Sequence, residues 1–83
     1  MPEYDRIGPY VISFYAYDRA EPVHVHVRRD RKEVKVWLGG NPGDEAVAFN
    51  HGFSAKEVRR IVRLVRHERE GIIRFWNAFF GED

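Results

Sequence analysis

The clearest alternation of apolar and polar residues in the chain runs from Pro22 to Arg28. Successive side chains of a β-strand point to opposite faces, so this segment predicts a strand with two chemically different faces. One face would carry Val23, Val25 and Val27, and the other His24, His26 and Arg28. We expect the histidine face to be polar and turned toward solvent, with the two imidazoles side by side.

A similar alternation from Val34 to Leu38 predicts a second strand, paired with the first across a charged tip. If Asp30 and Arg31 form the turn, one register places valines opposite valines and polar groups opposite polar groups. The expected pairs are Arg28 with Glu33, Val27 with Val34, His26 with Lys35, Val25 with Val36 and His24 with Trp37. A shift by one residue would bury both histidines among valines, so the pattern favours this register. A four-residue loop in the same register is the open alternative.

Two further strands are expected on either side of this hairpin. The segment from Tyr10 to Tyr17 is rich in aromatic and β-branched residues and follows the Gly8-Pro9 break, which is typical of a strand. The segment from Ala46 to Phe49 follows the densest turn sequence of the chain, residues 39–44, and predicts a short strand. With the hairpin, these segments predict an antiparallel β-meander of three to four strands.

A long amphipathic helix is expected after the strands. Ser54, with Glu57 three residues later, is a capping box that predicts the helix start. Apolar residues then recur at spacings of three and four, and Gly81 is expected to stop the helix near Phe80. Gly71 costs about 1 kcal/mol relative to alanine inside a helix, so it marks either a kink or a break. We expect one continuous helix.

The predicted fold class is therefore α+β, with the meander packed against the C-terminal helix in one domain that covers residues 1–83. The chain has no cysteine, so a disulfide and a thiolate zinc site are both excluded. Its net charge is +1, with arginine and lysine concentrated in residues 19–35 and 54–74. Because we find neither a long apolar run nor a leader peptide, we expect a cytoplasmic protein that does not enter a membrane.

One use of the histidine face is metal binding. Two histidines at alternate positions of a strand can both ligate a divalent ion. Zinc would need a third ligand, and His51 is the only other histidine outside the body of the helix. No carboxylate is expected close enough to complete the set, so we favour a protein without a cofactor and leave a metal at His24 and His26 as the alternative.

A second use of the same face is acid–base chemistry. Imidazole titrates near neutral pH, so His24 and His26 are candidate catalytic residues, with Tyr15 as a third participant if its strand lies beside the hairpin. Arg28 and Lys35 on the same face could hold the charge of a phosphate. Metal-independent ribonuclease chemistry needs little more than this set. An ordinary solvated sheet face without any site is the plainest alternative.

The helix carries a second set of candidate phosphate-binding residues. Arg59, Arg63 and Arg66 lie at helical spacings of four and three, which is compatible with a stripe that follows a nucleic-acid backbone. His51 lies just before the helix, whose N-terminus attracts anions. The alternative is a helix surface that is charged for solubility alone.

Five motifs occur in a characteristic order: Arg6–Tyr10, Glu21–Val27, Lys35–Leu38, Asn50–Ser54 and Trp76–Gly81. In this combination the chain resembles a small bacterial family catalogued as domain of unknown function 4160, and the resemblance covers nearly the whole chain. The family typically has two prolines before the first histidine, where this chain has Pro22-Val23. Both histidines are retained.

The resemblance implies a function for the whole protein, because some members of the family are described as toxins of type II toxin–antitoxin pairs. It implies a growth-inhibiting toxin that acts on RNA or translation and is held inactive by a small cognate protein. The rival interpretation is a non-enzymatic binding module, antitoxin-like or an adaptor, which binds a protein or a nucleic acid. Its aromatic C-terminus would form a partner or homodimer interface, through Phe75, Trp76, Phe79 and Phe80.

Overall fold

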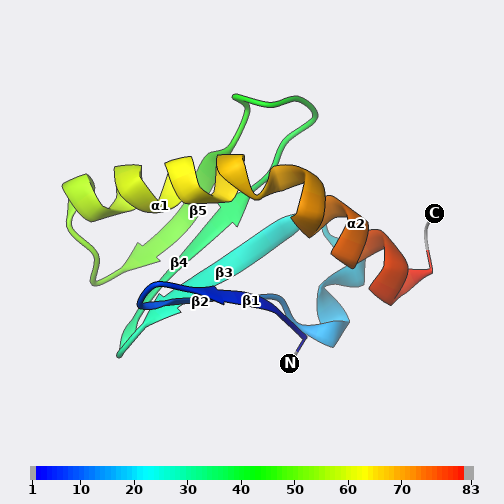
Figure 1. Cartoon of the computed structure of the whole chain (residues 1–83), viewed down its shortest axis with the longest axis horizontal. Coiled ribbons are helices and arrows are strands. Elements are labelled where there is room, and N and C mark those ends of the chain that lie inside the picture. Colours follow the sequence, from blue (N-terminus) through cyan, green and yellow to red (C-terminus); the bar gives the residue numbers. More distant parts are fainter. Residues whose placement is uncertain (1, 82–83) are drawn as a thin grey trace.

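The computed structural model describes residues 2–81 and has an α+β fold, as predicted. One antiparallel sheet contains five strands in the order β1-β2-β3-β4-β5, one more than the predicted maximum of four. The strands are β1 (Glu3–Ile7), β2 (Tyr10–Ser13), β3 (His24–Arg29), β4 (Lys32–Trp37) and β5 (Ala46–His51). A 3₁₀ helix, η1 (Ala16–Ala20), follows β2, and two α-helices, α1 (Ala55–His67) and α2 (Arg69–Phe80), follow β5. Figure 1 shows α1 lying across one face of the sheet.

The predicted hairpin of β3 and β4 is confirmed. The register pairs His24 with Trp37, His26 with Lys35 and Arg28 with Glu33, as expected. The turn contains two residues, and the first of them, Asp30, has a φ of 56°. Asp tolerates this left-handed conformation better than most residues, which explains a tight turn without glycine.

The expected strand from Tyr10 to Tyr17 is wrong at its C-terminal end, because β2 stops at Ser13. The Asp18 carboxylate accepts a hydrogen bond from the backbone N–H of Tyr15 at 2.8 Å, and the Asp18 N–H donates to the Tyr15 carbonyl at 2.9 Å. A side chain that bonds its own neighbouring backbone competes with strand pairing. The chain therefore turns into η1 and does not continue along the sheet.

Strand β1 was not expected, because its sequence does not alternate clearly. Only Tyr4 and Ile7 of its five residues are partly buried, and the others are exposed. β1 pairs with β2 through a turn at Gly8, where φ is 57°. The Gly8-Pro9 break is thus the turn of a hairpin and not only the start of a strand.

The core lies between the valine face of the sheet and the helices. Val25, Val27, Val34 and Val36 are fully buried there, together with Ile61 and Val65 of α1 and Ile72 of α2. Ser54 caps α1 as predicted, since its hydroxyl accepts the N–H of Glu57 at 3.1 Å. The histidines of β3 must point away from this core because they alternate with its valines.

The prediction of one continuous helix is wrong, because two helices, α1 and α2, meet at Glu68, which has φ −92° and ψ 4°. Figure 1 shows the change of direction there. The break lies three residues before Gly71, which is inside α2. The hydroxyl of Tyr4 fills the space that a Cβ at position 71 would need. The tyrosine hydroxyl donates to the Glu68 carboxylate at 2.8 Å. The helix end is as predicted, with Gly81 left-handed at φ 71°.

The lengths of the helices also bear on the membrane expectation. α1 has 13 residues and α2 has 12, whereas a membrane span needs roughly 20 apolar residues. Within residues 2–81, no helix is long and apolar enough to cross a bilayer.

Candidate metal centre

The histidine face is not solvated, which corrects the sequence-based expectation. The exposed fraction is 0% for His24 and 6% for His26. The rings of Trp37 and Trp76 pack edge-on against His24, with centroids 5.2 and 5.3 Å away, and Tyr15 packs against His26 at 4.7 Å. Because these rings exclude water, replacing either histidine by alanine is expected to lower the stability of the folded protein.

Asp18 is the residue that the sequence interpretation missed. It lies in η1, which folds back against the histidine face, and its exposed fraction is only 3%. One carboxylate oxygen, Oδ2, lies 3.0 Å from Nε2 of His24 and 3.5 Å from Nε2 of His26. A third side chain that could ligate a metal ion, expected to be His51 or absent, is therefore present as a buried carboxylate.

The other ring nitrogen of each histidine is held by an acceptor. Nδ1 of His24 lies 2.8 Å from the carbonyl oxygen of Pro22, and Nδ1 of His26 lies 3.1 Å from the Glu33 carboxylate. A carbonyl and a carboxylate only accept, so both Nδ1 atoms must carry the hydrogen. In a neutral imidazole, Nε2 then keeps its lone pair. Both Nε2 atoms are thus set up as ligands.

The two Nε2 atoms are buried and have no hydrogen-bond partner among residues 2–81. Both atoms lie close to Oδ2 of Asp18, at 3.0 and 3.5 Å, but neither contact is a hydrogen bond. Two lone pairs beside a carboxylate repel one another unless a proton or a cation lies between them. An unsatisfied buried polar atom costs about 1–3 kcal/mol, so this arrangement needs a further positive partner.

The spacing of the three atoms matches the coordination sphere of zinc. His24, His26 and Asp18 each offer one ligand atom, and these three atoms lie within 4.8 Å of one another. Nitrogen and oxygen ligands at 2.0–2.2 Å from a tetrahedral zinc ion lie about 3.3–3.6 Å apart. The distance from Oδ2 of Asp18 to Nε2 of His26, 3.5 Å, lies in this range, and the distance to Nε2 of His24, 3.0 Å, is about 0.3 Å shorter. Three protein ligands would leave one position of a tetrahedral ion without a ligand among these side chains.

The remaining residues predicted for this face have other contacts. Lys35 donates to the Glu21 carboxylate and lies over the ring of Trp37, 4.3 Å from its centroid. Burial raises the pKa of Tyr15, and the negative charge of Glu33 adds to the shift, so its hydroxyl stays protonated at neutral pH. His51 is exposed at the end of β5, where its ring packs on Phe49 at 4.8 Å.

Arg28 is the one predicted phosphate-binding residue of this face with an unsatisfied atom. It lies beside His26 on the same side of β3, and its Nε is buried without a hydrogen-bond partner in the described part of the chain.

The structure separates the predicted arginine stripe from the histidines. Arg59, Arg63 and Arg66 are exposed on α1, which packs on the opposite face of the sheet. Arg66 donates to the Glu45 carboxylate at 2.7 Å. The histidines and the arginine stripe therefore lie on opposite faces of the sheet and do not form one site.

A buried arginine outside the predicted set holds the loop before β5. Arg69 has an exposed fraction of 6%, and it donates to the carbonyl oxygens of Leu38 and Gly39 and to the Glu45 carboxylate. No pattern in the sequence distinguishes Arg69 from the exposed arginines of the helix. Its role depends on the break at Glu68, which turns its side chain toward the loop.

The aromatic C-terminus is largely used inside the protein. The rings of Phe75, Trp76, Phe79 and Phe80 surround Phe14, with centroids 4.8–5.5 Å from it. Among them only Phe79 is strongly exposed, at 47%. The number of aromatic residues is therefore explained by packing and is not evidence for an interface.

Comparison with known proteins identifies a family but no characterised relative. No curated protein and no solved structure matches the chain. The model of one family matches residues 10–77, and this range includes η1, β3, β4, β5 and α1 and so all three residues of the candidate metal centre. The chain therefore belongs to the family described as domain of unknown function DUF4160.

Proposed function

We propose that this chain binds one divalent transition-metal ion, with Zn²⁺ the best match, through Asp18, His24 and His26. The observation that carries the proposal is a pair of buried imidazole nitrogens without hydrogen-bond partners in the described chain, both beside a buried carboxylate. A cation in this position would satisfy all three groups at once. Imidazole and carboxylate ligands without a thiolate suit zinc and related ions.

The surroundings support a metal centre in a second way. Histidine ligands usually donate their other ring N–H to a carboxylate or carbonyl, which fixes the ring and makes the ligand more basic. Glu33 accepts this hydrogen bond from His26, and the carbonyl of Pro22 accepts it from His24. A buried Nδ1–H needs an acceptor in any case, so these outer partners support the centre only together with the unpaired Nε2 atoms on the inner side.

The centre would also define the chemistry of the protein. When bound, an ion with three protein ligands and one open position can polarise a substrate oxygen or lower the pKa of a bound water molecule. His24 and His26 then hold the ion and do not exchange protons, since Nε2 is the coordinating atom. An activity on RNA or translation, as the family resemblance implies, would accordingly be metal-dependent and not metal-independent.

Growth inhibition is also part of the proposal, in the form of a growth arrest that depends on the metal centre. A toxin that uses this centre would arrest growth of a bacterial host on induction, and the Asp18→Asn variant would not. If the metal-loaded wild type is well expressed and growth continues, the toxin role is refuted and the centre belongs to a binding module. This outcome leaves metal binding itself intact, because binding is measured separately.

Isothermal titration of the metal-free protein with Zn²⁺ tests the binding directly. We expect one ion per chain for the wild type and a loss of affinity of more than about 100-fold for Asp18→Asn, His24→Gln and His26→Gln. His67→Gln is the matched control, because His67 lies on α1, away from the histidine face. Circular dichroism confirms that each variant is folded. The proposal would be refuted if the folded wild type bound no Zn²⁺, or if the His67→Gln variant lost Zn²⁺ binding.

A further inference from the structure

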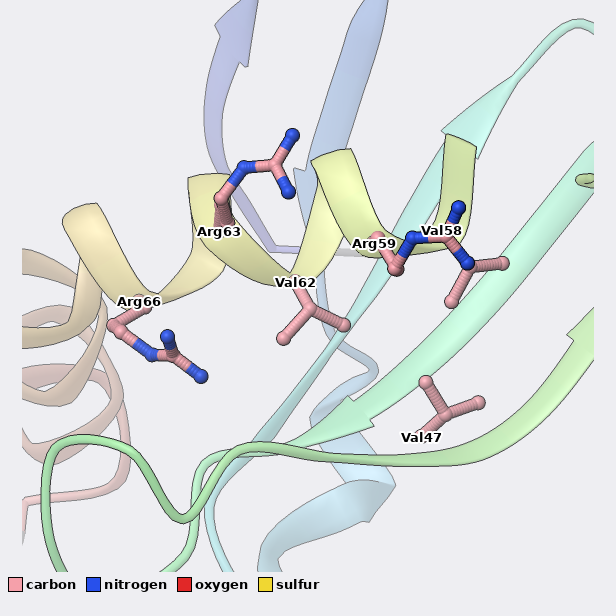
Figure 2. A pocket seen from close by; sticks show the side chains of 6 residues that line it. All are labelled: Val47, Val58, Arg59, Val62, Arg63 and Arg66. Atoms are coloured by element: carbon pink, nitrogen blue, oxygen red, sulfur yellow. The ribbon is translucent and has the colours of Figure 1, made fainter. Parts of the chain in front are cut away.

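The face of the sheet opposite the metal centre carries an open groove between α1 and β5. It has a volume of about 430 Å³ and is lined by Val47, Val58, Arg59, Val62, Arg63 and Arg66. Figure 2 shows Val62 on α1 and Val47 on β5 facing each other across the groove, with the arginines spaced along the helix. The groove shares no residue with Asp18, His24 or His26, so variants of its lining leave the candidate metal ligands in place.

The lining combines an apolar floor with a positive rim. Val47 is unusually exposed for a valine on the core side of a sheet, at 41%, and Val58 and Val62 are only partly buried. Arg59 and Arg63 are exposed, and no ion pair involves either of them within residues 2–81. Arg66 pairs with Glu45 at one end of the groove. A ligand that fits must therefore bring apolar side chains and negative charge together.

The strand beside the groove offers a second means of binding. β5 lies at the end of the sheet and pairs with β4 only, as far as the described chain shows. The outer backbone groups of an edge strand can pair with an extended segment of another protein, whose alternate side chains then enter neighbouring pockets. Five of the six residues of β5 are exposed, and only Phe49 is partly buried.

We propose that this groove binds an acidic, extended segment of a partner protein. The segment would lie along β5, place β-branched or other aliphatic side chains on the valine floor, and pair carboxylates with Arg59 and Arg63. RNA fits less well, because the floor has no aromatic ring on which a base could stack, and sequence-tolerant RNA contacts depend on such stacking. A peptide with aliphatic and acidic side chains would contact both the valine floor and the arginine rim of the groove.

Selection from a phage-displayed library of random linear peptides tests the proposal and can itself identify the sequence that the groove prefers. We expect the selected peptides to be rich in Asp and Glu that alternate with aliphatic residues. In fluorescence anisotropy, the best peptide should bind about tenfold more weakly to Arg59→Glu and to Arg63→Glu, and more weakly at high salt. Val47→Asp should weaken binding as well.

The matched control is Arg60→Glu, since Arg60 is exposed on the same helix but does not line the groove. Peptide binding should be unchanged in this variant. Three outcomes would overturn the proposal: selection without acidic enrichment, equal binding by the Arg59 and Arg60 variants, or tighter binding of a single-stranded RNA oligonucleotide that depends on Arg59 and Arg63.

Discussion

At the scale of single residues, the burial of the two histidines depends on residues outside the alternating segment that predicts their strand, Asp18 above all. Alternation in β3 correctly predicted that His24 and His26 share a face. It could not predict burial, because the cover comes from Asp18 in η1 and from tryptophans on β4 and α2. A polar face of a strand reads the same in sequence whether water or another part of the chain covers it.

The outer partner of His26 gives a prediction at this scale. Replacing Glu33 by alanine removes the acceptor for Nδ1 and leaves all three proposed ligands in place. We expect the Zn²⁺ affinity to fall about 10-fold, as it does when the outer partners of other metal ligands are removed. Titration calorimetry measures the change, with Glu70→Ala as the control because Glu70 is exposed on α2. An unchanged affinity would show that Glu33 does not support the centre.

At the scale of the elements, the helix prediction failed at one place for an identifiable reason. The apolar spacing continues through both helices, so periodicity alone gives one helix. At the break, Glu68 accepts a hydrogen bond from Tyr4 of β1, a contact between residues far apart in the sequence that periodicity does not reveal. Since β1 was itself not expected, its effect on the helix could not be predicted.

Gly71 provides a direct test of this packing. Alanine in place of a glycine within an exposed helix usually stabilises the helix by about 1 kcal/mol. Here a Cβ would collide with the Tyr4 hydroxyl, so we expect Gly71→Ala to destabilise the protein by about 1–3 kcal/mol in urea unfolding. The double variant Tyr4→Phe/Gly71→Ala should recover part of the loss. A stabilised single variant would contradict the close contact.

The ion pairs of Glu45 make the stability of the folded protein depend on pH. Burial acts to raise the pKa of Glu45, but hydrogen bonds from Arg66, from its own backbone and from Arg69 outweigh it and lower the pKa to about 2 from 4.5. A lowered pKa means that the folded state binds the proton less well than the unfolded state. This contribution to stability is complete above about pH 4.5 and is lost as the pH falls toward 2.

Thermal unfolding of the wild type and of Glu45→Gln across this range checks the prediction. The difference in melting temperature between the two should be largest above pH 4.5 and should shrink as the pH falls. A difference that does not change with pH would mean that the Glu45 charge contributes nothing beyond its neutral contacts.

At the scale of the whole molecule, the sheet lies between the two sets of predicted binding residues, the histidine face and the arginines of α1. The predicted α+β meander, the hairpin register and the start and end of the helical segment could be derived because they follow from local periodicity and capping. The separation of the arginines of α1 from the histidines follows in the same way, because the apolar stripe of the helix packs on the valine face of the sheet and the histidines alternate with those valines. The result is a candidate metal centre on one face and a basic groove on the other.

Metal binding should also stabilise the whole molecule, because the centre joins η1 to β3. A ligand that binds only the folded state stabilises it by about 2.7 kcal/mol when present at 100 times its dissociation constant. We expect Zn²⁺ to raise the melting temperature of the wild type and to leave that of Asp18→Asn unchanged. An equal rise in both proteins would place the bound ion elsewhere.

The most direct test of the metal centre is anomalous diffraction at the zinc absorption edge, from crystals of the Zn²⁺-loaded wild type. The proposal predicts one strong peak per chain, about 2.0–2.2 Å from Nε2 of His24, Nε2 of His26 and a carboxylate oxygen of Asp18. A map without a peak there, with the Asp18 carboxylate accepting a direct hydrogen bond from a protonated His24, would contradict it.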